Sequence, residues 1–205
     1  MKQVSGSQKT PKTARGRQTR DKLLQAAEIE FGEKGFHDAA ISGITHRAGV
    51  ALGTFYSYFE GKEEIFQALV SYMNRRIRSW IAERIADAPD RITAERLGLE
   101  AYIEFVREHR GIYRIVQEAE FIANDEFREH YESLSLAYAA NLNKAGASGE
   151  LRHGDYEIWS WALLGMALFL GMRYAEWEEE ESPDRVAAVV ADMIAHGSVR
   201  KDGED

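Results

Sequence analysis

The residues with the clearest chemical potential lie in segment 41–59, which reads ISGITHRAGVALGTFYSYF. Its second half predicts a short helix whose outward residues carry no charge: Leu52, Gly53, Thr54, Tyr56, Ser57 and Tyr58. A helix with small and hydroxyl-bearing outward residues can approach the floor of a DNA major groove, and tyrosine hydroxyls can reach phosphates. Lys62 begins the next expected helix, where a cation and a helix N-terminus both favour an anion. The segment is therefore a candidate DNA-reading unit; the alternative is a plain helical hairpin whose tyrosines cover the core edges.

Apolar residues at helical spacing recur along the rest of the chain, and strand signals are scarce. The spacing predicts about nine helices, at residues 17–34, 41–48, 52–59, 62–86, 93–110, 112–121, 124–146, 155–177 and 183–196. We therefore expect an all-α fold, with a three-helix helix-turn-helix head followed by a larger helical body. The expected division is a flexible basic arm over 1–16, a DNA-binding domain over 17–77 with its reading unit at 41–60, a body over 78–197 and a flexible tail over 198–205.

Composition argues against several other classes of protein. The 205 residues include no cysteine, which excludes a disulfide scaffold, a thiol nucleophile and a Cys-ligated metal site. The six histidines show no metal-ligand spacing, and the common phosphate-binding and nucleophile motifs are absent. We expect no enzymatic activity, no metal and no cofactor. The longest uncharged run, 158–172, is shorter than the ~18 residues of a membrane span, so a cytoplasmic protein is expected.

Charge is distributed unevenly along the chain. Residues 1–62 contain 10 Lys and Arg against 6 Asp and Glu, whereas residues 63–205 contain 16 against 28. A protein that binds DNA must hold such an acidic body away from the phosphates, which predicts a separate distal body. The first twenty residues carry six cations and no acid, and Arg15 and Arg17 are candidate DNA contacts. A solvated tail is the alternative for this arm.

The segment 35–65 resembles the DNA-binding segment of the TetR family of bacterial transcriptional regulators. The matching features are Gly35-Phe36, Ala48-Gly49-Val50, Gly53-Thr54-Phe55-Tyr56, Tyr58-Phe59 and Lys62-Glu63, with Leu23, Leu24, Ala26, Ala27 and Phe31 before them. The resemblance implies a homodimer that binds a roughly palindromic DNA operator, usually as a repressor released by a small effector. The effector would tilt the long helix 62–86 and change the separation of the two reading helices. The alternative is a helical interaction protein with a vestigial DNA-binding unit.

The resemblance also implies roles for individual residues. Base edges would be faced by Leu52, Gly53, Thr54 and Ser57, and phosphates would be contacted by Tyr56, Tyr58 and Lys62. Ala39 and Ala40 stand where the family commonly has Thr, and Ala51 stands where it commonly has Ser. A missing hydroxyl cap removes about 1 kcal/mol of helix-end stabilisation. We expect Ser42 to substitute for the first of these losses.

The segment 155–177 is apolar around its whole circumference, which predicts a helix buried on all sides. One side is expected to form a subunit interface with the last helix, through Gly165, Leu168, Met172, Val186, Val190 and Met193; an ordinary core is the alternative. On the other side, Arg173 requires a partner, for which Glu118, Glu120 or an anionic ligand are candidates. An apolar or amphipathic effector, such as an acyl thioester or an aromatic acid, would lie among Phe105, Tyr113, Arg114, Phe121, Tyr131, Trp159, Arg173 and Trp177, although aromatic residues at this spacing are also typical of a core.

Overall fold

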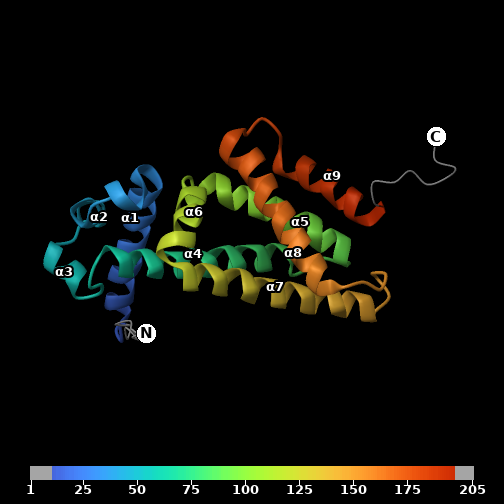
Figure 1. Ribbon diagram of the computed structural model, residues 1–205, viewed down its shortest axis with the longest axis horizontal. Helices are drawn as coiled ribbons and strands as arrows, with labels where there is room; N and C mark the ends of the chain where they lie inside the picture. Colours follow the sequence, from blue (N-terminus) through green and yellow to red (C-terminus); the bar gives the residue numbers. More distant parts are fainter. Residues whose placement is uncertain (1–10, 197–205) are drawn as a thin grey trace. The chain divides into compact units, whose positions relative to one another are not determined.

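The structure, a computed structural model, describes residues 11–196 (Figure 1). Those residues form nine α-helices and one π-helix, with no strand among them. The elements are α1 (Ala14–Asp38), α2 (Ile41–Ala48), α3 (Leu52–Tyr56), α4 (Lys62–Ile85), α5 (Arg91–Glu108), α6 (Ile112–Ile122), α7 (Asn124–Ala147), α8 (Tyr156–Gly171), η1 (Met172–Trp177) and α9 (Pro183–His196). The expected all-α fold is confirmed.

The first helix begins earlier than expected. The hydroxyl of Thr13 accepts a hydrogen bond from the N–H of Gly16 at 3.1 Å, which caps α1 and starts it at Ala14 rather than near residue 17. Arg15 and Arg17 therefore lie on a helix. The expected tail over 198–205, and residues 1–10 of the expected arm, lie outside the described residues.

The chain divides into two compact units. The described residues of the first unit are 11–74 and 111–130, and those of the second unit are 75–110 and 131–196. The first unit thus contains α6 as well as the first three helices, and α4 contributes residues to both units. The functional boundary expected after residue 77 stays a prediction.

The core of the first unit gathers around the end of α1. Gly35 has a φ of 76°, so the helix axis breaks there and Phe36 packs back into the core. The rings of Phe31 and Phe36 both contact Phe66 of α4 edge to face, with centroids 5.1 and 5.2 Å apart. The backbone N–H released at Phe36 donates to Oε2 of Glu118 at 2.8 Å, which joins α6 to this end of α1.

A close backbone approach fixes the start of α6 in the same unit. Gly111 has a φ of 88°, and a Cβ on it would lie 2.6 Å from the Cα of Gly32. Only glycine suits both the conformation and the spacing. Next to it, Nη1 of Arg114 donates to the carbonyl of Glu33 at 2.6 Å. These contacts explain why α6 belongs with α1.

Polar contacts buried between helices organise the second unit, in which α5 packs along α9. The hydroxyls of Ser135 on α7 and Ser160 on α8 are buried 2.7 Å apart. Within α5, Nε of Arg91 donates to Glu95 at 2.6 Å, and the hydroxyl of Tyr138 on α7 donates to the same carboxylate. Burial and the neighbouring Glu95 carboxylate raise the pKa of Tyr138 well above its usual value.

The expectation that helix 155–177 is buried on all sides is wrong. Within α8 only Ser160 and Gly171 are buried, whereas Ile158 and Phe169 are 64% and 65% exposed. By length and composition alone the stretch Tyr156–Trp177 could also cross a membrane, so the shortness of its uncharged run does not exclude a span. One face of this apolar helix is thus left uncovered by the described part of the chain.

Candidate nucleic-acid interface

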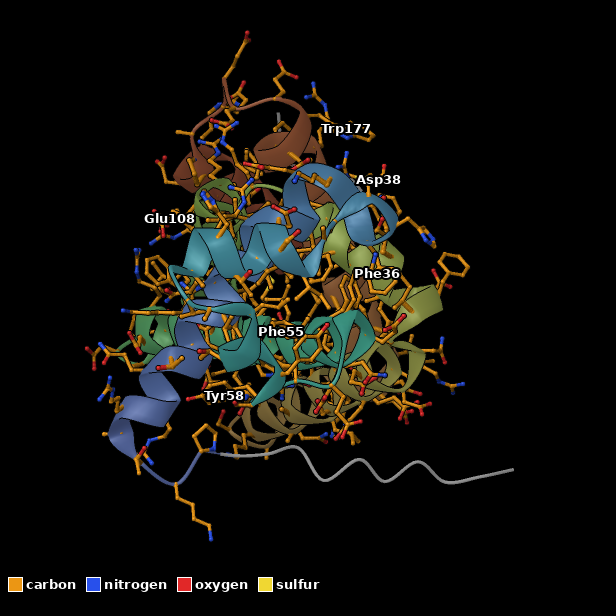
Figure 2. The ribbon with its side chains drawn as sticks, turned by 90° about the vertical axis from the view of Figure 1, so that its left-hand side faces the viewer. Phe36, Asp38, Phe55, Tyr58, Glu108 and Trp177 are labelled. Carbon is orange, nitrogen blue, oxygen red and sulfur yellow. The ribbon has the colours of Figure 1, made fainter. Side chains whose placement is uncertain are left out.

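The turn between α2 and α3 has the conformation that a sharp helical hairpin needs. Gly49 adopts the left-handed conformation, with φ 65° and ψ 36°, and Val50 donates to the carbonyl of Thr45 at 3.1 Å. Phe55 of α3 is buried (Figure 2). Phe59, just after the helix, is buried as well, and the two rings pack the inner side of α3 against the unit. The turn therefore presents the other side of α3 to solvent.

The outward residues of α3 are accessible, as a reading helix requires. Leu52 and Tyr56 are 51% and 49% exposed, Gly53 and Ser57 are exposed, and Thr54 and Tyr58 are half-buried. The helix ends at Tyr56, sooner than expected. The backbone N–H groups of Ser57, Tyr58 and Phe59 donate to carbonyls within α3 and continue it as a turn. The hydroxyl of Ser57 donates to the carbonyl of Gly53 at 3.1 Å, which leaves its lone pairs outward.

Neither reading-unit helix has a side-chain cap on its N-cap residue. Ala40 and Ala51 occupy these positions, and their methyl side chains cannot accept an N–H from the first turn. Ser42 is exposed, and its hydroxyl makes no hydrogen bond within residues 11–196. The expected substitution by Ser42 is therefore wrong as far as capping is concerned.

Lys62 is held by the end of α1. Its ammonium group donates to the carbonyls of His37 and Ala39 at 3.0 and 3.1 Å, and lies 4.7 Å from the centroid of the Phe36 ring. An ammonium group has three N–H donors, so one is left for a phosphate. Lys62 thus has a structural role that the sequence did not indicate.

Arg15 and Arg17, the other basic residues expected to contact phosphates, lie in the first turn of α1. Arg15 and Arg17 are exposed at the start of α1, where Nη1 of Arg17 donates to the carbonyl of Lys12 at 3.2 Å. The hydroxyl of Tyr58 lies beside this end of α1, 3.7 Å from where a Cβ on Gly16 would lie. The predicted phosphate contacts of Tyr58 and of the first turn of α1 therefore lie close together, although they come from separate parts of the sequence.

One buried acid in this unit escaped sequence reasoning. The side chain of Glu30 is 1% exposed and forms ion pairs with Lys34 at 2.6 Å and with Arg47 at 2.8 Å. Burial raises the pKa of the Glu30 carboxyl, but the hydrogen bonds from Lys34 and Arg47 outweigh it and lower the pKa. The spacing from Glu30 to Lys34 is visible in the sequence, whereas the contact with Arg47 depends on the fold.

The residues expected around an effector take different positions in the two units. In the first unit Tyr113 is buried, Arg114 is exposed, and Phe121 is 84% exposed. In the second unit Phe105 is buried beside Trp80 and His109, Tyr131 and Trp159 are half-buried, and Trp177 is 67% exposed. Burial raises the pKa of Tyr131. Phe121 and Trp177 thus lie at the surface and do not line an enclosed space.

Arg173 has a nearer partner than expected. Its guanidinium group pairs with Glu178, five residues along the chain, rather than with Glu118 or Glu120. Both members of the pair are partly solvent-exposed, so the charge is not isolated among tryptophans. The expectation of a remote carboxylate partner is corrected.

The residues expected at a subunit interface are mostly accessible. A Cβ on Gly165 would meet no atom within 4 Å, Met193 is 42% exposed, and Leu168, Met172 and Val190 are half-buried. Val186 is 6% exposed and is covered by its own chain. The exposed apolar residues of α8 and α9 also include Trp161, Phe169 and Val189.

The chain is similar to known bacterial regulators. The family described as "Bacterial regulatory proteins, tetR family" matches residues 23–69. The uncharacterized HTH-type transcriptional regulator YdgC of Bacillus subtilis is 28% identical over 193 residues, which cover 92% of this chain and 96% of YdgC. A second regulator of that organism, YvdT, is 30% identical over 68% of this chain and 73% of its own. The crystal structure of FadR from Bacillus subtilis in complex with stearoyl-CoA matches with a TM-score of 0.74 and 18% identity, over 87% of this chain and 99% of that chain.

The contacts of Lys62 generate a prediction about stability without DNA. Lys62→Met removes two charge-assisted hydrogen bonds to carbonyls, and we expect it to lower the free energy of unfolding by about 1–2 kcal/mol. Urea denaturation measures this change. Lys22→Met is the matched control, because Lys22 is exposed on α1 and makes no such bonds. Equal stability of the two variants would contradict a structural role for Lys62.

Proposed function

Because the chain belongs to the TetR family of bacterial transcriptional regulators, we propose that it is a dimeric repressor which binds a roughly palindromic DNA operator and releases it when a small effector binds. The observation that carries the proposal is the uncharged, accessible outer side of α3, with buried Phe55 and Phe59 beneath it. Such a helix suits a major groove, and a dimer of reading helices suits two half-sites about 34–36 Å apart.

The proposed contacts fall into two groups. Thr54 and Ser57, with Leu52 and the backbone at Gly53, face base edges and determine sequence preference. Phosphates are contacted by Tyr56, Tyr58, Lys62, Arg15 and Arg17, with Ser42 at the start of α2. The first group should affect specificity, and the second should affect affinity for any duplex.

Substitutions on α3 and α1 test this division. Thr54→Ala and Ser57→Ala should change the preferred operator sequence, at a cost of about 1–3 kcal/mol for the affected base pair. Tyr56→Phe should weaken all sequences alike, and Arg17→Gln should also reduce the salt slope by about one. Fluorescence anisotropy with duplexes from the DNA flanking the protein's own gene, against a scrambled duplex, measures both effects. If wild-type protein prefers neither duplex, the interaction protein with a vestigial reading unit becomes the better proposal.

A second copy of the chain is proposed to cover the exposed apolar side of α8 and α9. Gly165 leaves space for close helix approach, and Phe169 of α8 and Val189 and Met193 of α9 are exposed in the single chain. Burying such residues against their twins removes apolar surface from water on both copies. The same side would otherwise be an aggregation liability.

Phe169→Asp should disrupt this interface. Two carboxylates would enter the apolar contact without partners, which we expect to weaken dimerisation by about 100-fold or more. Analytical ultracentrifugation measures the association. Leu136→Asp is the control, because Leu136 of α7 is 71% exposed and lies outside the proposed interface. A wild-type protein that is monomeric at micromolar concentration would overturn the proposed dimer.

The effector is proposed to be an acyl thioester, with an aromatic acid as the second class. Support comes from the similar fold of FadR, which holds stearoyl-CoA, and from the aromatic residues of the second unit, Phe105, Tyr131 and Trp159. Effector binding would tilt α4 and alter the separation of the reading helices, which is a shift between two populated states. A protein with these partners works in the cytoplasm.

Thermal denaturation with a ligand panel tests the effector class. Stearoyl-CoA at one hundred times its dissociation constant should stabilise the folded protein by about 2.7 kcal/mol and release the DNA duplex. Free coenzyme A is the control for the head group, and benzoate represents aromatic acids. Stabilisation by benzoate alone would replace the acyl thioester, and no shift with any ligand would remove both classes.

A further inference from the structure

We propose that Glu30 of α1 is a positioning residue for DNA recognition, because its carboxylate caps the N-terminus of α2, which has no cap of its own. The inference rests on the proposed DNA-reading role of α3, which α2 carries through the turn at Gly49. The proposal gives a role to a buried carboxylate, Glu30, in a unit that must approach negatively charged phosphates.

The start of α2 lacks both groups of a standard helix cap. The N-cap residue is Ala40, and the third helical position is Gly43. In a capping box, the side chain of a Ser or Thr at the N-cap position accepts a hydrogen bond from the backbone N–H of the third helical residue. The side chain of a Glu or Gln at the third helical position accepts one from the backbone N–H of the N-cap residue. The first turn of α2 contains no acidic residue either. The free N–H groups there need an acceptor from another element.

The Glu30 carboxylate lies where the missing side chain would be. The backbone N–H of Ala40 is one of the groups that lower the pKa of this carboxyl, so the carboxylate faces the start of α2. A Cβ on Gly43 would lie 2.2 Å from Oε1 and 2.9 Å from Oε2 of Glu30. A side chain at position 43 would therefore displace the Glu30 carboxylate from this place. Gly43 keeps a right-handed helical conformation, so what requires glycine there is this space.

The same carboxylate also holds the other end of α2. Oε2 of Glu30 accepts from Nε of Arg47, in the last turn of the helix, at 2.8 Å. Glu33 pairs with Arg47 as well, and Lys34 lies 2.6 Å from Oε1 of Glu30. Glu30 thus connects α1 to both the first and the last turn of α2. The negative charge of Glu30 is also stabilised by the positive end of the α2 helix dipole. Fixing α2 in this way fixes the position from which α3 leaves the Gly49 turn.

Electrostatics gives the test a clear sign. A carboxylate near DNA repels phosphates, so the removal of its charge alone should strengthen binding to any duplex. A positioning residue has the opposite effect, because its loss lets α2 move and misplaces α3. A residue needed only for stability would leave the operator affinity of the folded protein unchanged.

The experiment compares three variants of the full chain at a temperature where circular dichroism shows each to be folded. Glu30→Gln should weaken operator binding by about fivefold to tenfold, the effect of a lost helix cap. It should also speed amide exchange at residues 40–44. Glu33→Gln is the matched control, since it removes an equal charge from a 56% exposed partner of the same arginine, and operator binding should stay equal or strengthen. Adding Ala40→Ser to Glu30→Gln gives α2 its own cap and should restore most of the lost affinity.

Gly43→Ala provides an independent variant that keeps every charge. Alanine has the higher helix propensity, so a purely local account predicts a more stable α2. The proposal predicts faster exchange at residues 40–44 and weaker operator binding, because the new methyl group displaces the carboxylate. If Glu30→Gln does not fold, Gly43→Ala decides the question.

Two results would overturn the proposal: Glu30→Gln binding the operator as tightly as Glu33→Gln, or Gly43→Ala matching wild type in both affinity and exchange. Wild-type protein that binds no duplex would instead remove the proposed function. The exchange measurement on Glu30→Gln needs no DNA, so it would still test whether Glu30 caps α2.

Discussion

The end of α1 is the constraint on which the first unit depends. Gly35 breaks the helix there, and the freed backbone groups need hydrogen-bond partners from elsewhere in the unit. Each partner comes from a different helix, because Glu118 of α6 accepts from Phe36 while Lys62 of α4 donates to the carbonyls of His37 and Ala39. Satisfying one broken helix end therefore determines where two other helices begin or dock, and the packing of Phe31 and Phe36 on Phe66 makes this junction apolar as well as hydrogen-bonded.

A helix of five residues such as α3 cannot maintain its own position, since a single turn forms too few hydrogen bonds to offset its ordering. Its position is inherited from α2 through the Gly49 turn and from buried Phe55 beneath it. The helix α2 is also short and begins without a side-chain cap of its own. The position of the reading surface thus depends on α1, the longest helix of the unit. Apolar packing alone would leave α2 free to shift, which is a reason for a buried charge on α1 to occur there.

Local features of this fold were predictable from sequence, and features that join distant segments were not. The bounds of α2 follow from Gly49 and the apolar spacing around Ile44, and the absence of caps follows directly from Ala40 and Ala51. The role of Lys62 was inferred from its own helix start, but two of its three N–H donors bind carbonyls twenty-three and twenty-five residues away. The sequence does not single out Glu30, because nothing local to it indicates that Gly43 leaves room for its carboxylate.

The error about α8 has a different physical origin. Apolar residues all round a helix predict that every side is covered, but they do not indicate whether the covering surface belongs to the same chain. The contacts of α8 within the second unit are specific: Ser160 pairs with Ser135, and Arg107 binds the carbonyl of Tyr174 in the π-helix that follows. These polar contacts determine which side of α8 faces its own chain. They leave Ile158, Gly165 and Phe169 outward in the single chain, so an apolar pattern all round a helix does not by itself show that its own chain covers every side.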